Sequence, residues 1–226
     1  MSRVWMLLVI GACAQATPAD RASDSGTTPD ASEHVMDAPP GHGSGSGTGS
    51  GTGSGTGSGT GSGNGCTFSG ALASWDLSAQ SGTEASAAAT AHATGVTAGP
   101  LTRAAAVTAQ SGAGSINGSG WPTAAALDAT KYYAFTLTPP TGCTMTLTNL
   151  AIDLKASGTG PANGSIATSK DSFAATTPVG TAAPSTPAVT VTTSGQLELR
   201  IYGYAATGTG GTLRVQNTLT VNGTIQ

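Results

Sequence analysis

Hydrophobic and polar residues alternate one by one through the C-terminal part of the chain. The longest run ends the sequence, and its apolar residues share one parity: Leu213, Val215, Leu219, Val221 and Ile225. A period of two places one set of side chains on a buried face of a β-strand and the other set in water. We therefore predict a long strand here, and we expect Asn217, which interrupts the apolar set, to bind backbone groups at a bend.

The same alternation predicts further strands. It is seen in Tyr133, Phe135 and Leu137, and again in Leu197, Leu199 and Ile201. Between them the parity changes near residues 148–149, from Cys143, Met145 and Leu147 to Leu150, Ile152 and Leu154, which predicts a bulge. Short strands separated by Gly- and Pro-rich turns favour an all-β, antiparallel sandwich or barrel.

A low-complexity segment separates this region from the N-terminus. From Gly43 to Gly65 every second residue is glycine, and Ser or Thr fills nearly all the positions between. Such a repeat offers little apolar area to offset the entropy of ordering, so residues 13–65 are predicted to be a disordered linker. Residues 66–226, about 160 in number, are the predicted folded domain, and a domain of this size buries roughly 70% of its unfolded surface.

Charge in this domain is sparse and balanced. Its acidic residues are Asp76, Glu84, Asp128, Asp153, Asp171 and Glu198, and its basic residues are Arg103, Lys131, Lys155, Lys170, Arg200 and Arg214. The two sets cancel, and no basic stripe is present to neutralise phosphates. We therefore expect no nucleic-acid partner.

The N-terminus has the features of an export signal. Arg3 precedes an apolar run from Val4 to Ile10, which is too short to span a bilayer but has the length of a signal-peptide core. The run ends in Ile10-Gly11-Ala12-Cys13, which resembles the lipobox of bacterial lipoproteins. This resemblance implies a signal peptide at residues 1–12 and lipidation of Cys13, which would anchor the protein in a membrane.

The residue after Cys13 is alanine rather than aspartate, so the lipoprotein sorting rule implies the outer membrane or the cell surface. A second cleavage motif, Ala14-Gln15-Ala16, leaves open a soluble secreted protein cut after Ala16. Export in either form places Cys66 and Cys143 in an oxidising compartment, where we expect a disulfide between them. Two free thiols are the alternative.

Several motifs follow one another in an order that resembles a jelly-roll β-sandwich module of secreted bacterial proteins, related to carbohydrate-binding modules. They are Trp75-Asp76-Leu77, Leu101-Thr102-Arg103, Gly120-Trp121, Tyr132-Tyr133-Ala134-Phe135, Pro140-Thr141-Gly142, Gly160-Pro161, Ser169-Lys170-Asp171-Ser172-Phe173 and Arg214-Val215-Gln216-Asn217. The resemblance implies a two-sheet antiparallel jelly roll and leaves the ligand open. The chain departs from the pattern at Leu77, where such modules tend to have phenylalanine, and at Ser172, where they tend to have glycine.

The sequence gives no sign of catalysis. The acidic residues are scattered, and Ser169 with Lys170 would point to opposite faces if both lay on a strand. We expect no enzyme activity and no cofactor. The resembling modules often carry a structural calcium ion, for which Asp76 is a possible ligand, but a single carboxylate makes a poor calcium site, so we predict no metal.

Binding is the remaining class, because sugars stack on aromatic rings. Arg200, Tyr202 and Tyr204 share the polar parity of one strand, and Trp121 follows a glycine in a turn-like setting. These four residues are the candidate ligand contacts, although Trp121 in the core and an ordinary surface ladder are the alternatives. The expected function is a non-catalytic surface lipoprotein displaying a module that binds a glycan or a surface protein. The alternative is a structural or envelope-assembly protein without a small ligand.

Overall fold

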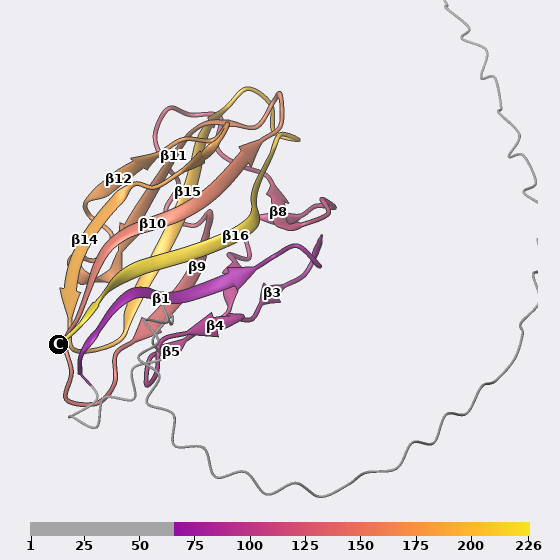
Figure 1. The fold of residues 1–226 in the computed structure, drawn as a ribbon. Helices are drawn as coiled ribbons and strands as arrows, with labels where there is room; N and C mark the ends of the chain where they lie inside the picture. Colours follow the sequence, from indigo (N-terminus) through magenta and orange to yellow (C-terminus); the bar gives the residue numbers. More distant parts are fainter. Residues whose placement is uncertain (1–65) are drawn as a thin grey trace, which may run out of the picture. The chain divides into compact units, whose positions relative to one another are not determined.

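A computed structural model describes residues 66–226 of the chain. The predicted signal peptide at residues 1–12, the lipidation site Cys13 and the linker at residues 13–65 lie outside the described residues and stay predictions. The described part is all-β, as the alternation predicted, with strands arranged in two mostly antiparallel sheets that pack as a sandwich (Figure 1). One short 3-10 helix, η1 (Ser169–Asp171), interrupts the strands of this part.

The first sheet contains the longest strands. Its central order is β14 (Ala188–Thr193), β10 (Met145–Ala156), β16 (Thr212–Ile225), β1 (Phe68–Asp76) and β4 (Ala91–His92). β13 (Pro184–Ser185) pairs with β10 beyond β14. β8 (Ser115–Ser119) pairs with β16 and with the short strands β2 (Ser81–Gly82) and β7 (Thr108–Ala109).

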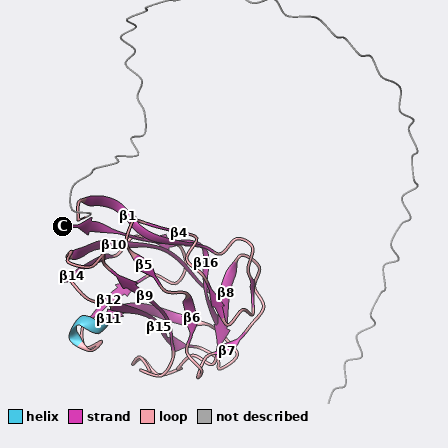
Figure 2. Cartoon of the chain, turned by 90° about the horizontal axis from the view of Figure 1, so that it is seen from below, coloured by secondary structure: helices cyan, strands magenta, loops and turns pink. Residues whose placement is uncertain are grey.

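The second sheet covers the other side of the core (Figure 2). Its order is β12 (Thr176–Val179), β11 (Pro161–Thr168), β15 (Leu197–Ala206), β9 (Tyr132–Thr138), β6 (Leu101–Arg103) and β3 (Ser86–Ala87). β5 (Thr97–Ala98) also pairs with β9. The strands β9, β15 and β11 therefore form its centre.

The strand pairs are nested in the way that defines a jelly roll. The innermost pair is β11 with β12, and β10 with β14, β9 with β15, and β1 with β16 follow outward along the chain. The chain alternates between the sheets as it passes from one pair to the next, which is the topology of a jelly roll. The expected fold class is thus confirmed, with β2 to β8 inserted between the first strand and the rest.

The core consists of the side chains that the alternation selected. On β16 the four residues Leu213, Val215, Leu219 and Val221 are fully buried, and Ile225 is 1% exposed. The parity change in β10 is also explained, because the register shifts between Leu147 and Asn149 against both neighbouring strands. This bulge brings Leu147 and Leu150 into the same core, as predicted.

Asn217 lies at a second irregularity in the pairing of β16 with β10. Ala151 and Asp153, two positions apart on β10, lie opposite Thr220 and Gln216, which are four positions apart on β16. The φ of Asn217, 59°, is left-handed, and its amide donates to the Asp153 carboxylate at 2.6 Å. The expected bend is present, and the backbone N–H of Asn217 donates to Gly114 O at 2.9 Å. The expected contact of its side chain with backbone groups is wrong, because the bulge turns this side chain to the exposed outer surface, where it bonds to a carboxylate.

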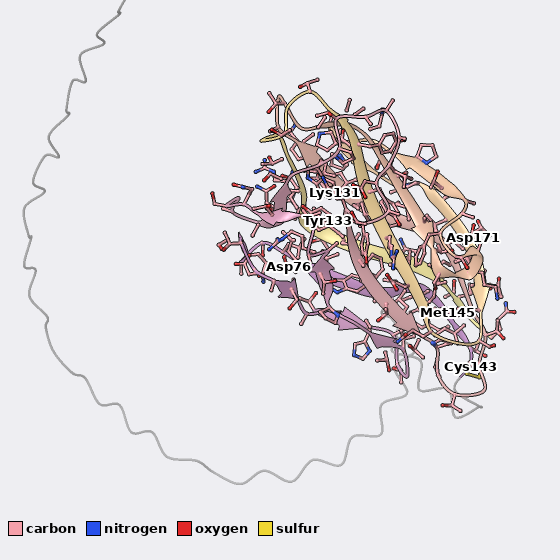
Figure 3. All side chains as sticks on the ribbon, turned by 180° about the vertical axis from the view of Figure 1, so that it is seen from behind. Asp76, Lys131, Tyr133, Cys143, Met145 and Asp171 are labelled. Carbon is pink, nitrogen blue, oxygen red and sulfur yellow. A yellow bond between two sulfur atoms is a disulfide. The ribbon has the colours of Figure 1, made fainter. Side chains whose placement is uncertain are left out.

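The expected disulfide joins Cys66 and Cys143, with Cα atoms 5.3 Å apart. Figure 3 labels Cys143 at one end of the sandwich. The two cysteines precede β1 and β10, which lie on opposite sides of β16 and both pair with Ile225. The bridge therefore ties together the two strands that flank the C-terminal end of β16.

Candidate functional site

Trp121, one of the four predicted ligand contacts, lies in the core. It is 2% exposed, its Nε1 donates to Gly118 O at 2.8 Å, and its ring packs at 5.4 Å from that of Tyr133. Tyr133 in turn donates its hydroxyl to Leu213 O on the opposite sheet. Trp121 therefore has no open ring face for a ligand, which corrects its place among the candidate contacts in favour of the core interpretation.

The other three candidates lie on β15 and face away from the core, as their parity predicted. They do not form one patch, however. Tyr202 is only 2% exposed, because the ring of Tyr132 on the neighbouring strand packs edge-on against it at 5.8 Å. Tyr204 lies farther along β15 opposite Asn163 and is partly exposed.

Arg200 occupies the centre of this outer face. Its Nε donates to Glu198 Oε1 at 2.7 Å, and its guanidinium lies 4.2 Å from the ring centre of Tyr132 and 3.8 Å from that of Phe173. Cation–π contacts of this kind stabilise a guanidinium and fix its plane. Burial alone would lower the pKa of Arg200, but the hydrogen bond and the charge of Glu198 raise it above its ordinary value, so the side chain stays cationic.

Phe173 reaches Arg200 from the loop that follows β11. Ser172 and Phe173 have φ angles of 58° and 63°, a left-handed conformation that is rare for residues other than glycine. The position of Ser172 is thus one that favours glycine. Hydrogen bonds hold the loop, with Phe173 N donating to Thr168 O at 2.9 Å and Glu198 N to Ser169 Oγ at 2.9 Å.

Ser169 and Lys170 lie in η1 and not on a strand, so the strand geometry used to argue against a serine–lysine pair was wrong. Ser169 Oγ accepts the backbone N–H of Glu198 at 2.9 Å, and Asp171 Oδ2 accepts that of Ala175 at 2.8 Å. Both side chains hold the loop in place.

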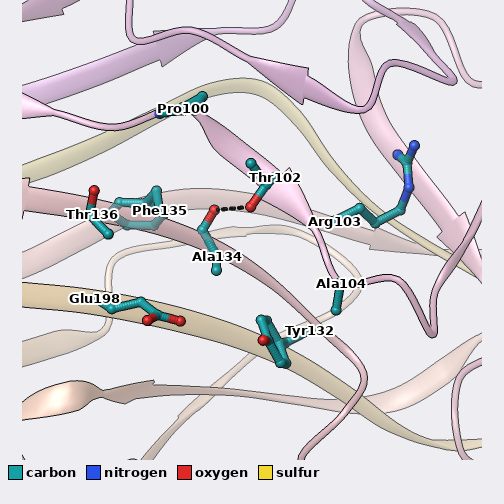
Figure 4. A pocket seen from close by; sticks show the side chains of 9 residues that line it. All are labelled: Pro100, Thr102, Arg103, Ala104, Tyr132, Ala134, Phe135, Thr136 and Glu198. Carbon is teal, nitrogen blue, oxygen red and sulfur yellow. Dashed lines mark hydrogen bonds between the residues drawn. The ribbon is translucent and has the colours of Figure 1, made fainter.

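Beside Arg200 the outer face is hollowed into a shallow depression of about 340 Å³. It forms because the small residue Ala134 lies opposite Arg200 on β9, while larger side chains surround it. Figure 4 shows Tyr132, Thr136 and Glu198 around this position. Thr102 closes one side and donates its hydroxyl to Ala134 O at 3.1 Å.

Arg103 also borders the depression, but its guanidinium points away from it (Figure 4). It donates to the backbone carbonyl oxygens of Gly82, Thr83, Glu84 and Asn117 at 2.7 to 3.3 Å. Arg103 therefore stabilises the loop after β2 rather than offering its charge to the depression.

Three residues of this face, Tyr132, Phe173 and Glu198, were not among the predicted contacts. The outward position of Tyr132 could have been predicted, because its parity is opposite to that of the core residues Tyr133 and Phe135 on the same strand. The outward position of Glu198 could also have been predicted, because it has the same parity as Arg200. Nothing in the sequence pattern indicates that the loop brings Phe173 onto Arg200.

Within residues 66–226 no three His, Cys, Asp or Glu side chains lie close enough together to hold a metal ion. Asp76 was the possible calcium ligand. Its carboxylate accepts the backbone N–H of Ser78 at 2.9 Å, and the hydrogen bonds with Ser78 lower the pKa of this carboxyl group. Of the helices in this part of the chain, none has the length and apolar character of a membrane span.

Comparisons of the chain with protein-family models, curated proteins and solved structures give no match.

Proposed function

We propose that the domain is a non-catalytic glycan-binding module that acts through the outer face of β9 and β15. One observation carries this proposal: the Tyr132 ring, the Glu198 carboxylate and two threonines surround the small residue Ala134 in one depression. A sugar offers C–H groups that stack on a ring and hydroxyls that donate to a carboxylate. The depression therefore suits a hydroxyl-rich ligand with an apolar face.

The charges of the face favour a neutral glycan. Arg200 binds one oxygen of Glu198, so the charges of this pair compensate each other and the second carboxylate oxygen remains for a ligand hydroxyl. Their side chains are 21% and 32% exposed, which keeps both within reach of a ligand. The Arg200 guanidinium also holds the Tyr132 ring in place, so little ring motion is lost when a sugar binds.

The same residues support binding rather than hydrolysis. Glycoside hydrolysis ordinarily needs two carboxyl groups on either side of the scissile bond. Among the described residues that line the depression, Glu198 is the only acid. The proposed module therefore holds its ligand and leaves it intact.

Display at a surface completes the proposal and rests on the sequence alone. The lipobox-like Ile10-Gly11-Ala12-Cys13 supports a lipid anchor, and the Gly/Ser/Thr repeat supports a spacer between the anchor and the domain. Intact mass of the mature protein tests this, because a lipid anchor predicts acyl chains on Cys13 and cleavage after Ala16 predicts a chain beginning at Thr17. Replacing Cys13 by serine should release the protein from membranes, and retention would count against lipidation.

The test of ligand binding uses the full-length protein on a panel of immobilised glycans, followed by calorimetry with the best ligand. Tyr132→Ala should weaken binding by at least about tenfold, because it removes the stacking ring. Glu198→Gln should weaken it as well. Tyr204→Ala is the matched control, since it removes an aromatic side chain from the same face outside the depression.

All variants must keep the circular dichroism spectrum of the unmodified protein. The proposal fails if no glycan binds, or if binding survives both Tyr132→Ala and Glu198→Gln. Weakening by Tyr204→Ala alone would place the ligand at the far end of β15 and refute the proposed site.

A further inference from the structure

The loop after η1 holds two consecutive residues in a conformation that residues other than glycine avoid. Ser172 and Phe173 have φ angles of 58° and 63°, and in this left-handed region the Cβ atom comes too close to the following carbonyl oxygen. A backbone of this kind persists only where the surrounding structure imposes it, and such residues gather at binding sites. The strain therefore needs a compensating contact.

That contact is the one between Phe173 and Arg200. The ring centre of Phe173 lies 3.8 Å from the guanidinium carbon, and that of Tyr132 lies 4.2 Å from it. Phe173 follows β11 and Tyr132 begins β9, and these two strands flank β15 on opposite sides. The guanidinium is thus held by one aromatic ring from each side, and cation–π attraction acts at both contacts.

The neighbouring strands offer no other side chain that could hold the guanidinium. The residues directly opposite Arg200 are Ala134 on β9 and Ala167 on β11, and both carry only a methyl group. A long side chain without fixed contacts samples many rotamers. Without the Phe173 ring, the guanidinium would therefore be free to move on the β11 side.

Arg200 connects Phe173 to the depression. Its Nε donates to Glu198 Oε1 at 2.7 Å, and Glu198 and Tyr132 both line the depression, whereas Phe173 lies outside the residues that line it (Figure 4). We propose that Phe173 is a positioning residue for the glycan site. Its ring holds Arg200, and Arg200 in turn fixes the Glu198 carboxylate and the Tyr132 ring in the orientation that a sugar meets. This inference rests on the proposed function.

The first test needs no ligand and uses the full-length protein. Nitrogen-15 relaxation gives the order parameter of the Arg200 Nε–Hε bond, and Arg200→Lys assigns the signal by removing it. The order parameter should be close to that of rigid backbone, about 0.85, and should fall below about 0.6 in Phe173→Leu. Phe173→Tyr keeps an aromatic ring and should keep the high value. Arg103, held by backbone carbonyl groups, should be unchanged in both variants.

The second test is calorimetry with the best ligand from the glycan panel. Phe173→Leu should weaken binding about tenfold, because the ligand must then order two side chains that were held before, and Phe173→Tyr should bind normally. The matched control is Phe68→Leu, which removes another partly exposed ring, on β1 in the other sheet. It should change neither the order of Arg200 nor the affinity.

An unchanged order parameter of Arg200 in Phe173→Leu would overturn the proposal. Unchanged glycan affinity in a variant whose Arg200 has become mobile would also overturn it, as would equal weakening by Phe173→Leu and Phe173→Tyr. Absence of glycan binding by the unmodified protein would instead refute the proposed function, and the relaxation data would still show whether Phe173 holds Arg200.

Discussion

Removal of the disulfide between Cys66 and Cys143 should lower the stability of the domain by several kcal/mol. The bridge closes a loop with a sequence separation of 77 residues. In the chain-entropy treatment, such a loop restricts the unfolded chain by about 4.5 kcal/mol at 25 °C. Domains are stable by only about 5–15 kcal/mol, so this is a large share of the total.

The folded state gives no reason to reduce this value much. β1 and β10 are each paired with β16 at Ile225, next to the bridge, so these strands stay in place when the bridge is absent. Replacing both cysteines by serine should therefore act mainly on the unfolded chain. The expected fall in melting temperature is roughly 9–18 °C for a domain of this size.

Urea unfolding followed by tryptophan fluorescence measures the loss, because Trp75 and Trp121 are buried and report the core. The unmodified protein under reducing conditions should behave like the double serine variant, and a reductant should leave that variant unchanged. Slowly exchanging amides of β16 should exchange about a thousand times faster in the variant. A loss below about 1 kcal/mol, or faster exchange confined to the first residues of β1, would refute the reasoning.

Three further changes test the packing. Tyr133→Phe leaves the buried carbonyl of Leu213 without its donor and should cost about 1–3 kcal/mol in urea unfolding. Gly118→Ala drives a methyl group into the Val107 side chain and should cost about 1–3 kcal/mol, whereas Gly158→Ala, with no atom within 4 Å, should cost much less. Glu84 accepts two backbone N–H groups, from Ser81 and Gly82, which lower the pKa of its carboxyl group from 4.5 to about 2. Glu84→Gln should therefore lower the stability of the domain above pH 4.5, and the difference between variant and unmodified protein should vanish as the pH falls toward 2.

The strand pattern was sufficient for the fold because the rule behind it is local. Side chains alternate between faces wherever a strand is regular, and a bulge shows itself as a change of parity. This is why the odd-numbered residues of β16 and the irregularity between Leu147 and Asn149 could be predicted. The exposure of Asn217 could not, because two extra residues of β16 are accommodated there and parity no longer indicates the face.

The candidate site was predicted less well because parity gives the face of a residue and not what covers that face. Tyr202 has the outward parity that was assigned to it, yet Tyr132 covers it. Phe173 comes from a loop with two consecutive left-handed residues, and no periodicity applies to such a loop. The outward position of Tyr132 was available from its alternation with Tyr133, and only its contact with Arg200 required the structure.

Tyr132 and Tyr133 are adjacent on β9 but serve the two different faces of the second sheet. Tyr133 points inward and ties the sheets together through Leu213, while Tyr132 points outward and borders the depression. If the outer face is a binding site, Tyr132→Ala should impair ligand binding and leave most of the stability intact. Tyr133→Phe should lower the stability and leave ligand binding intact. A large loss of stability from Tyr132→Ala would instead mean that Tyr132, Arg200 and Phe173 form a second small core. The glycan proposal would then lose its main support.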